Sequence, residues 1–431
     1  MTDPDPAHQV VNKPDSDLWL AYANKVKALL APEGLGSDGT IFMTAIGAQG
    51  IAAGTNVPEP IKNLGVYDVG NNLLNTETPV FIPGGESYYD YVDAYVHNVN
   101  LVGDLSPGQK DALDRAKKKL DAAVKAENGE YKAALADYKQ RIAGNTFTGT
   151  FSKFVDSGFA EAYREAMQER QDAAEDEQAI LNKISGNDAP RLNKTKRKVE
   201  AAGDSSELKP GIDNSYDAEV DDWIARFDTA QPTNISFKVS EGQSSSWNKH
   251  GFDELKVHVA GSLFWFINAS FDMDDKTETS HISAAQATQD ITVTISTRGQ
   301  GVFGIHPDHW DTSVTDFQMH NTSLPPILTK PAIRVEKVLM AYGVSMDIDL
   351  ESSLATQVHD LVDKAKTMSG SASISFFGLN IGGSFSSTST STITFDDIQF
   401  QNGGTRIHIP ADNSAFPTML AVLGRKLDLP Q

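Results

Sequence analysis

A chain of 431 residues, 39% hydrophobic and 22% charged, is long enough for two or three domains and a large buried core. Its net charge of −21 at pH 7 argues against nucleic acid as a partner, because phosphates are bound by clustered Lys and Arg side chains. The sequence contains no cysteine, which excludes disulfides, thiol nucleophiles and cysteine-ligated metals.

The start of the sequence bears on localisation. The first twenty residues contain no basic segment followed by an apolar core, so we expect no cleavable secretory signal. The longest uncharged apolar stretch, Thr40 to Gly54, is shorter than the roughly 18 residues of a membrane-spanning helix. We therefore expect a cytoplasmic protein, or one released without a classical signal peptide.

The first half of the chain is expected to be mainly helical. Residues 1–16 are polar and rich in Pro and Asp, which predicts a disordered tail. Apolar residues then recur at helical spacing over 18–30, over 88–99 and from Tyr216 to Phe227. These patterns predict a mainly helical domain over 17–230.

The clearest helical signal lies within 106–185. Ser106-Pro107-Gly108-Gln109 combines a capping hydroxyl, a first-turn proline and a capping-box glutamine. Two apolar stripes follow, one from Leu113 to Ile142 and one from Phe159 to Ile184, joined by a loop at Gly144–Gly149. The sequence predicts an antiparallel helical hairpin, which is either part of a packed bundle or a projecting coiled coil that mediates assembly.

After Pro232 the apolar residues alternate, which is typical of strands, and we place the main boundary near Ala230. One order of patterns occurs twice: an aromatic strand, a Thr-alternating strand, a glycine turn and an Ile-His strand. The two sets lie near Trp265, Thr292–Ile295 and Ile305–His306, and near Phe377, Thr392–Phe395 and Ile407–His408. The sequence therefore predicts an α+β protein. Its region 231–431 is expected to be an internally duplicated antiparallel β-sandwich with copies at 232–320 and 325–431.

Two long alternating segments, 257–271 and 371–395, are candidate membrane hairpins. A strand rises about 3.3 Å per residue, and a tilted membrane strand needs roughly ten residues to cross the bilayer. The first segment is longer than that. The uncharged tract Ser386–Thr392 could line a polar lumen, although open sandwiches also use such strands. The side chains assigned to membrane or assembly contacts are Trp265, Ile267, Phe271, Phe377, Leu379, Ile381 and Phe385.

Two polar segments are weak metal candidates. His306, Asp308 and His309 could bind zinc or iron, but Pro307 breaks the spacing and no distant third ligand is indicated. Another set, Asp347, Asp349 and Glu351, shares one face of a strand and could hold Ca²⁺, although a solvent-facing strand has the same pattern. We expect no metal at either segment.

No dinucleotide fingerprint, P-loop, nucleophile elbow or zinc-protease motif occurs in the sequence, so we assign no catalytic residue and expect no cofactor. The first hypothesis is a non-enzymatic, self-assembling protein that engages a lipid membrane and forms pores through its β-hairpins. The alternatives are a soluble binding or scaffold module that recruits partners through the helical hairpin, and a cofactor-independent enzyme with a pocket between the two halves. The expected partners are copies of the same chain and a lipid membrane, and not nucleic acid.

Overall fold

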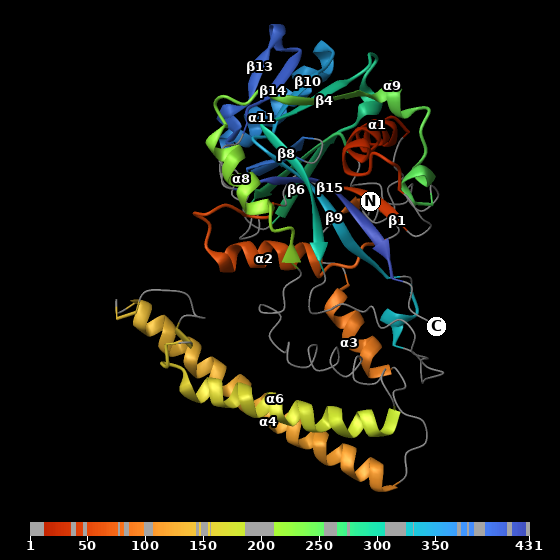
Figure 1. Cartoon of the computed structure of the whole chain (residues 1–431). Coiled ribbons are helices and arrows are strands. Elements are labelled where there is room, and N and C mark those ends of the chain that lie inside the picture. The colour runs from red at the N-terminus through yellow and green to blue at the C-terminus, as the bar shows by residue number, and fades with distance from the viewer. Residues whose placement is uncertain are drawn as a thin grey trace. The chain divides into compact units, whose positions relative to one another are not determined.

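A computed structural model places the residues that follow: 13–35, 40–45, 50–75, 78–81, 86–98, 107–143, 146–147, 154–155, 157–185, 211–253, 265–273, 276–306, 325–330, 332–368, 372–376, 379–382, 393–411 and 416–427. Within these ranges the chain is α+β, as the sequence predicts, with eight α-helices and three sheets (Figure 1). It divides into two compact units. The first comprises Met1–Tyr91, Ser206–Asp308 and Pro326–Asp428, and the second comprises Val92–Ser205, His309–Pro325 and Leu429–Gln431.

A six-stranded sheet forms the centre of the first unit. Its order is β2 (Val80–Phe81), β1 (Thr40–Ala45), β15 (Thr418–Lys426), β9 (Ile333–Tyr342), β8 (Gly299–His306) and β3 (Gly211–Ile212). All pairs are antiparallel except β1 with β2. This sheet combines strands from both sides of the boundary expected near Ala230.

Helix α1 (Lys13–Leu30) packs on β15, β9 and β1 of this sheet. Its segment from Leu18 to Ala23 is buried all round, which is typical of a helix enclosed by a core. The helix includes the last four residues of the predicted tail, while 1–12 lie outside the described residues. Asp15 explains the early start, because its carboxylate accepts hydrogen bonds from Ser283 Oγ (2.7 Å) and the Ala284 amide (2.6 Å).

Two smaller sheets are antiparallel throughout and are compatible with the predicted sandwich. The five-stranded sheet has the order β13 (Gln399–Gln401), β14 (Arg406–Ile409), β10 (Ser345–Asp349), β7 (Thr292–Thr297) and β4 (Thr233–Lys238). The four-stranded sheet has the order β12 (Leu379–Gly382), β11 (Ala372–Phe376), β5 (Ile267–Met273) and β6 (Lys276–Ile282). Along β7 buried and half-buried residues alternate, so one face of that sheet belongs to the core.

Four helices complete the first unit's described part. They are α2 (Glu59–Gly70), α8 (Tyr216–Ala225), the single turn α9 (Val239–Gly242) and α11 (Ser352–Met368). The first two pack on β8 and β9, whereas α11 packs on β11 and β5 of the four-stranded sheet. Helix α3 (Tyr88–Asn98) spans the division between the two units.

The internal duplication is not confirmed. Strand β7 belongs to the five-stranded sheet, but Phe395, its expected counterpart, lies in a 3₁₀ turn. Ile305 lies in the six-stranded sheet, whereas Ile407 lies in the five-stranded sheet. The two aromatic strands, β5 and β11, pair with each other in one sheet. Similar local patterns therefore occupy different places, because alternation encodes a buried face and not the identity of the neighbouring strand.

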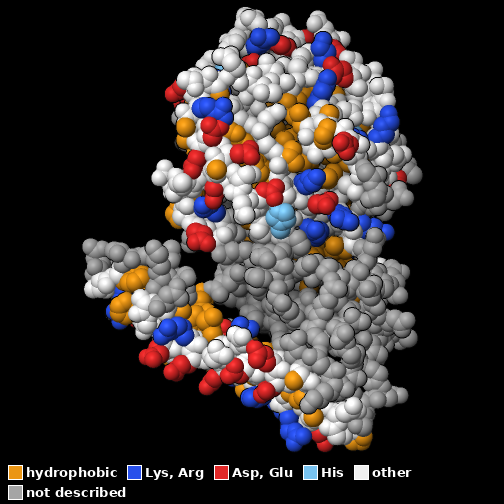
Figure 2. Space-filling view, viewed as in Figure 1, with side chains coloured by type: hydrophobic (Ala, Val, Ile, Leu, Met, Phe, Trp, Pro, Cys, Tyr) orange, Lys and Arg blue, Asp and Glu red, His pale blue; other side chains and the backbone are white. Residues whose placement is uncertain are grey.

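In the second unit, α4 (Pro107–Ala143) and α6 (Glu161–Ser185) pack side by side. Lys119 contacts Asp176, Glu127 contacts Arg170, and the rings of Tyr131 and Tyr163 meet at 5.5 Å, so the two helices run antiparallel. The inward residues of α6 recur at alternating steps of three and four, the spacing of a coiled-coil seam. Charged side chains cover the outer faces (Figure 2). Among the helices described, none is long and apolar enough to cross a bilayer.

Candidate functional site

The four-stranded sheet holds the described members of the predicted membrane hairpins. Ile267 and Phe271 are fully buried in β5, opposite Phe376 and Ala372 of β11. Trp265, just before β5, is half-buried and stacks on the His281 ring of β6 with the centroids 3.6 Å apart. Ile267 and Phe271 therefore belong to the core of the first unit.

The remaining hairpin residues are only partly described. Leu379 and Ile381 lie in β12, in register with Phe376 and Ile374 of β11. Phe377 and Phe385 lie outside the described residues. The sequence prediction of Leu379 and Ile381 as membrane contacts stays a prediction.

One amphipathic helix, α11, covers the apolar face of this sheet. Its inward stripe consists of Leu354, Ala355, Val358, Val362 and Ala365, all in one buried cluster with β5 and β11. Lys364 reaches across to β6, with its Nζ 2.8 Å from Glu278 Oε1 and 4.2 Å from the centroid of the Phe271 ring. Because both charged groups are more than a third exposed, this ion pair contributes at most about 1 kcal/mol. Small apolar side chains therefore provide most of the attachment of α11.

Of the first weak metal set, only His306 is described, and it pairs with a carboxylate. Its Nε2 lies 2.7 Å from Asp213 Oδ1, and Asp213 Oδ2 accepts a 2.6 Å hydrogen bond from the Gly304 amide. Partial burial alone would raise the pKa of Asp213. The hydrogen bonds from Gly304 and His306, together with the charges of His306 and Lys337, outweigh burial and lower this pKa. The pair fastens β3 to the edge of β8, while Asp308 and His309 lie outside the described residues.

The second weak metal set is separated by its own partners. Asp347 lies 2.7 Å from His408 Nδ1, and Asp349 forms two hydrogen bonds with Arg406 at 2.6 and 2.9 Å. Glu351 instead accepts hydrogen bonds from Thr288 and Ser353. In the part of the chain that the structure describes, no three His, Cys, Asp or Glu side chains are grouped to hold a metal ion.

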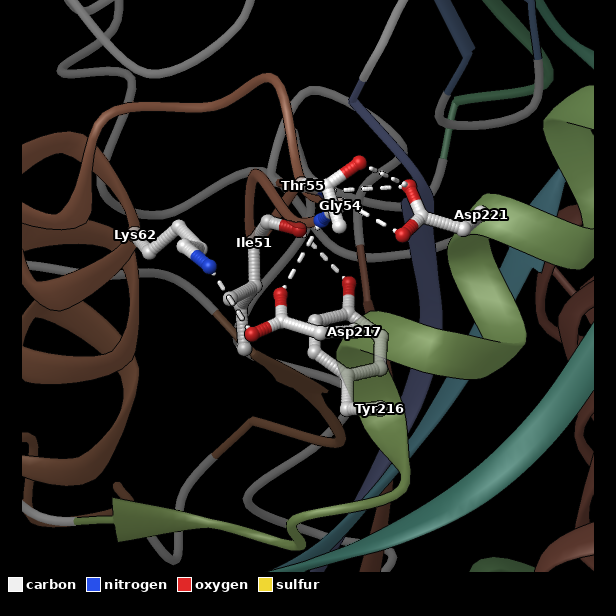
Figure 3. A network of polar contacts seen from close by, with 7 residues as sticks. All are labelled: Ile51, Gly54, Thr55, Lys62, Tyr216, Asp217 and Asp221. Carbon is white, nitrogen blue, oxygen red and sulfur yellow. Dashed lines mark hydrogen bonds and ion pairs between the residues drawn. The ribbon is translucent and has the colours of Figure 1, made fainter.

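A denser polar network joins the loop at Ile51–Thr55 to α8 (Figure 3). Asp217 accepts hydrogen bonds from the Gly54 amide (3.0 Å) and from Lys62 Nζ (2.8 Å), and one turn later Asp221 accepts a 3.0 Å bond from the Thr55 amide. Tyr216, at the start of the helix, donates to the Ile51 carbonyl at 2.6 Å. Burial, with the charge of Asp217, raises the pKa of Tyr216 far above its ordinary value, so its hydroxyl stays a donor.

The network fixes the loop rather than exposing reactive groups. Burial favours a higher pKa for Asp217, but the hydrogen bonds from Lys62 and Gly54 and the Lys62 charge outweigh it, so this pKa is lowered. Gly54 has φ +104°, and a Cβ there would lie 2.7 Å from Asp221 Oδ1. Lys62 therefore neutralises Asp217, the loop donates hydrogen bonds to both carboxylates, and the arrangement is a structural attachment of the loop to α8.

His250 is a buried titratable group that the sequence analysis did not identify. It is 0% exposed, and its ring lies 5.5 Å from that of Phe42 and 5.8 Å from that of Trp247. Neither ring nitrogen has a hydrogen-bond partner among the described residues. Burial lowers the pKa of His250 to about 3, and the charges of Lys27 and Lys249 act in the same direction. The ring is therefore neutral at physiological pH.

An aromatic cluster, which we define as Tyr138, Phe147, Phe154 and Phe159, lies where α4 ends and α6 begins. Phe154 is the fully buried centre, 5.6 Å from Tyr138, 5.4 Å from Phe147 and 5.4 Å from Phe159 by ring centroids. Phe159 is 46% exposed, and the Arg141 guanidinium carbon lies 4.6 Å above its ring. Phenylalanines are closely spaced after Ala143 in the sequence, but the predicted connecting loop at Gly144–Gly149 included only Phe147, and Phe159 was predicted as the start of the second helical stripe.

Comparison of the chain with protein-family models, with curated proteins and with solved structures finds no match.

Proposed function

We propose that the protein is a non-enzymatic, self-assembling protein that engages lipid membranes through its four-stranded sheet, with pore formation as the outcome. The observation that carries this proposal is the cover of that sheet by one helix. The apolar face that includes Ile267 and Phe271 is enclosed on its open side by α11, whose inward stripe is mostly Ala and Val. Displacing α11 would expose a β-surface of the kind that inserts into a bilayer.

The energies of exposure and insertion are of similar size. Withdrawing Leu354, Val358 and Val362 from the core costs roughly 1.5–3 kcal/mol each, or about 6 kcal/mol in total. The same range applies to each of Ile267, Phe271, Ile374 and Phe376, which would regain an apolar environment in hydrocarbon. In water, displacing α11 therefore exposes both sets of side chains, whereas in a membrane the sheet residues stay in an apolar environment and only the cost of exposing the α11 stripe remains.

Insertion would also require several copies of the chain. In the described residues the sheet ends at β12 and at β6, each of which pairs with one strand only. An open strand edge leaves backbone N–H and C=O groups unpaired, at a cost of several kcal/mol for each group in hydrocarbon. Copies that join edge to edge would satisfy these groups, which supports a homo-oligomer.

A cleavable cross-link tests whether α11 must move. Because the sequence has no cysteine, Lys364→Cys with Glu278→Cys introduces one thiol pair between α11 and β6, where the native side chains are 2.8 Å apart. A disulfide-containing bismaleimide joins them. Matched controls are Lys25→Cys and Glu241→Cys, which replace a similarly exposed 2.9 Å ion pair between α1 and α9.

Dye release from liposomes is the readout. We expect release by the wild type and by the cross-linked control, no release by the cross-linked α11 pair, and recovery when reductant cleaves the linker. Release by the locked α11 pair would contradict the proposal. Absence of wild-type release at every lipid composition and pH would contradict pore formation altogether.

The aromatic cluster supports a second candidate function, a soluble scaffold that recruits protein partners through the helical hairpin. Phe159 is exposed on one end of the paired helices, as expected for a contact residue. Under this alternative, the wild type leaves liposomes intact, and Phe159→Ser abolishes a defined protein complex.

A further inference from the structure

A row of acidic side chains lies along the outside of α6. We define the acidic stripe as Glu165, Glu169, Asp172 and Asp176, which are all exposed and recur at steps of four, three and four. Figure 2 shows acidic side chains gathered along the paired helices. Like charges at this spacing repel one another, so the stripe destabilises α6 unless cations neutralise it. Among the described residues, only Asp176 of the four has an ion pair, to Lys119 of α4 at 2.6 Å.

A row of lysines lies along the outside of α4. We define the lysine stripe as Lys118, Lys125 and Lys132, which are exposed and share one face because they recur at steps of seven. At 3.6 residues per turn, Lys125 and Lys132 lie about 120° and 140° around the helix from Lys119, so the stripe points away from the acidic stripe. None of the three lysines has an ion pair with another described residue. Apart from Lys119, the other exposed charges of 114–132 are two acidic and two basic, which cancel: Asp114, Arg115, Lys117 and Asp121.

The two stripes lie at the same level along the paired helices. Two ion pairs set the register between α4 and α6: Lys119 with Asp176, and Glu127 with Arg170. Because the helices are antiparallel, this register places each lysine of the stripe level with an acidic residue: Lys118 with Asp176, Lys125 with Asp172, and Lys132 with Glu165. At about 1.5 Å per residue, the lysine stripe is about 21 Å long and the acidic stripe about 17 Å. The stripes therefore match in level and length and are opposite in charge.

We propose that these stripes are the self-assembly surface of the protein, with the acidic stripe of one copy bound to the lysine stripe of a second copy. Charge complementarity over a matching length is the argument for this occupant. Because the stripes are level, the paired helices of the two copies lie side by side and point in the same direction. The contact is heterologous, so it repeats into a ring where the rotation between copies closes, and into a filament otherwise. This inference rests on the self-assembly proposed above and assigns it to α4 and α6.

Reversal of one stripe at a time tests the pairing. One variant carries Lys118→Glu, Lys125→Glu and Lys132→Glu, and the other carries Glu165→Lys, Glu169→Lys and Asp172→Lys. Each variant alone brings like charges together, so its association constant in sedimentation velocity at low salt should fall more than tenfold. An equimolar mixture of the two should associate like the wild type, because every contact again joins opposite charges. Salt near 1 M, where the Debye length is about 3 Å, should dissociate the wild type.

The matched control reverses three exposed cations outside both stripes: Lys110→Glu, Arg164→Glu and Lys238→Glu. It changes the net charge as much as the lysine-stripe variant does, and it should associate like the wild type. Circular dichroism must show the wild-type helix content in every variant. A wild type that remains a single chain at low salt would overturn the surface, and so would stripe reversals that leave association unchanged.

Cross-linking tests the direction of the contact without reversing a stripe. Because the sequence has no cysteine, Lys125→Cys and Asp172→Cys each introduce one thiol. A short bismaleimide should join the two variants when they are mixed, whereas neither variant should form dimers alone, since a heterologous contact does not bring a residue beside its own copy. Dimers from Lys125→Cys alone, in the yield of the mixture, would contradict the head-to-tail contact.

Dye release from liposomes, measured on the same samples, separates this inference from the proposed function. A wild type that associates through the stripes but releases no dye contradicts pore formation and leaves the self-assembly surface standing. A wild type that releases dye, together with stripe reversals that associate and release dye as it does, contradicts the surface and leaves the membrane proposal standing.

Discussion

Acid is expected to destabilise the first unit through His250. The side chain is fully buried between Phe42 and Trp247, and its ring nitrogens have no hydrogen-bond partners among the described residues. A proton on this ring would place an unpaired charge in the core, near two lysines that repel it. The folded protein therefore keeps the ring neutral at pH values where the unfolded chain protonates it.

The sign and size of the effect follow from the two pKa values of His250. The ordinary value is 6.5, and burial lowers it to about 3 in the folded protein. Below pH 6.5 the His250 ring binds a proton in the unfolded chain but not in the folded protein. The free energy of unfolding therefore falls by about 1.4 kcal/mol per pH unit until about pH 3. The loss is about 2 kcal/mol at pH 5 and about 3 kcal/mol at pH 4.

Urea unfolding followed by tryptophan fluorescence measures this loss, because Trp247 lies beside the ring. Carboxylates with lowered pKa values also lose stability in acid, so the quantity of interest is the difference between wild type and His250→Leu. We expect the variant to lose about 2 kcal/mol less between neutral pH and about pH 5. The exposed His359→Gln should behave like the wild type. Equal pH dependence of wild type and His250→Leu would refute the reasoning.

Two further predictions concern stability. Gly54→Ala should lower the free energy of unfolding by about 2–4 kcal/mol, since it combines a positive φ with a contact to Asp221. Gly34→Ala, with φ +91° and open space around it, should lower it by only about 1–2 kcal/mol. Equal losses in chemical unfolding would show that the contact is relieved at no cost. Leu120→Asp, at a 4% exposed position in the contact between α4 and α6, should lower the free energy of unfolding by about 3 kcal/mol or more. The exposed Lys118→Asp should lower it little. An unchanged melting temperature for Leu120→Asp would show that this contact is not a stabilising core.

Periodicity in the sequence predicted the fold class because burial repeats with the geometry of each element. The alternation of Thr292–Ile295 corresponds to β7, and the stripe from Leu113 to Ile142 corresponds to α4. The start of α1 could not be predicted, since Asp15 is buried by Ser283, a residue far along the chain. The same limit explains the unconfirmed duplication: a local pattern does not specify which sheet a strand joins.

The candidate site was predictable only in part. Alternation placed Ile267 and Phe271 on one face of a strand, but it gave no information on what covers that face. The buried His250 left no trace in the sequence, because a single histidine carries no pattern. In contrast, the aromatic cluster had a visible signal in its closely spaced phenylalanines.

Hydrogen–deuterium exchange with and without anionic vesicles tests the central claim most directly, because it reports the release of α11 itself. On vesicles, the amides of 352–368 are predicted to lose protection, while those of β4 and β7 in the five-stranded sheet keep it. If α11 keeps its full protection while the bound protein releases dye, the four-stranded sheet has not been uncovered and the account is contradicted.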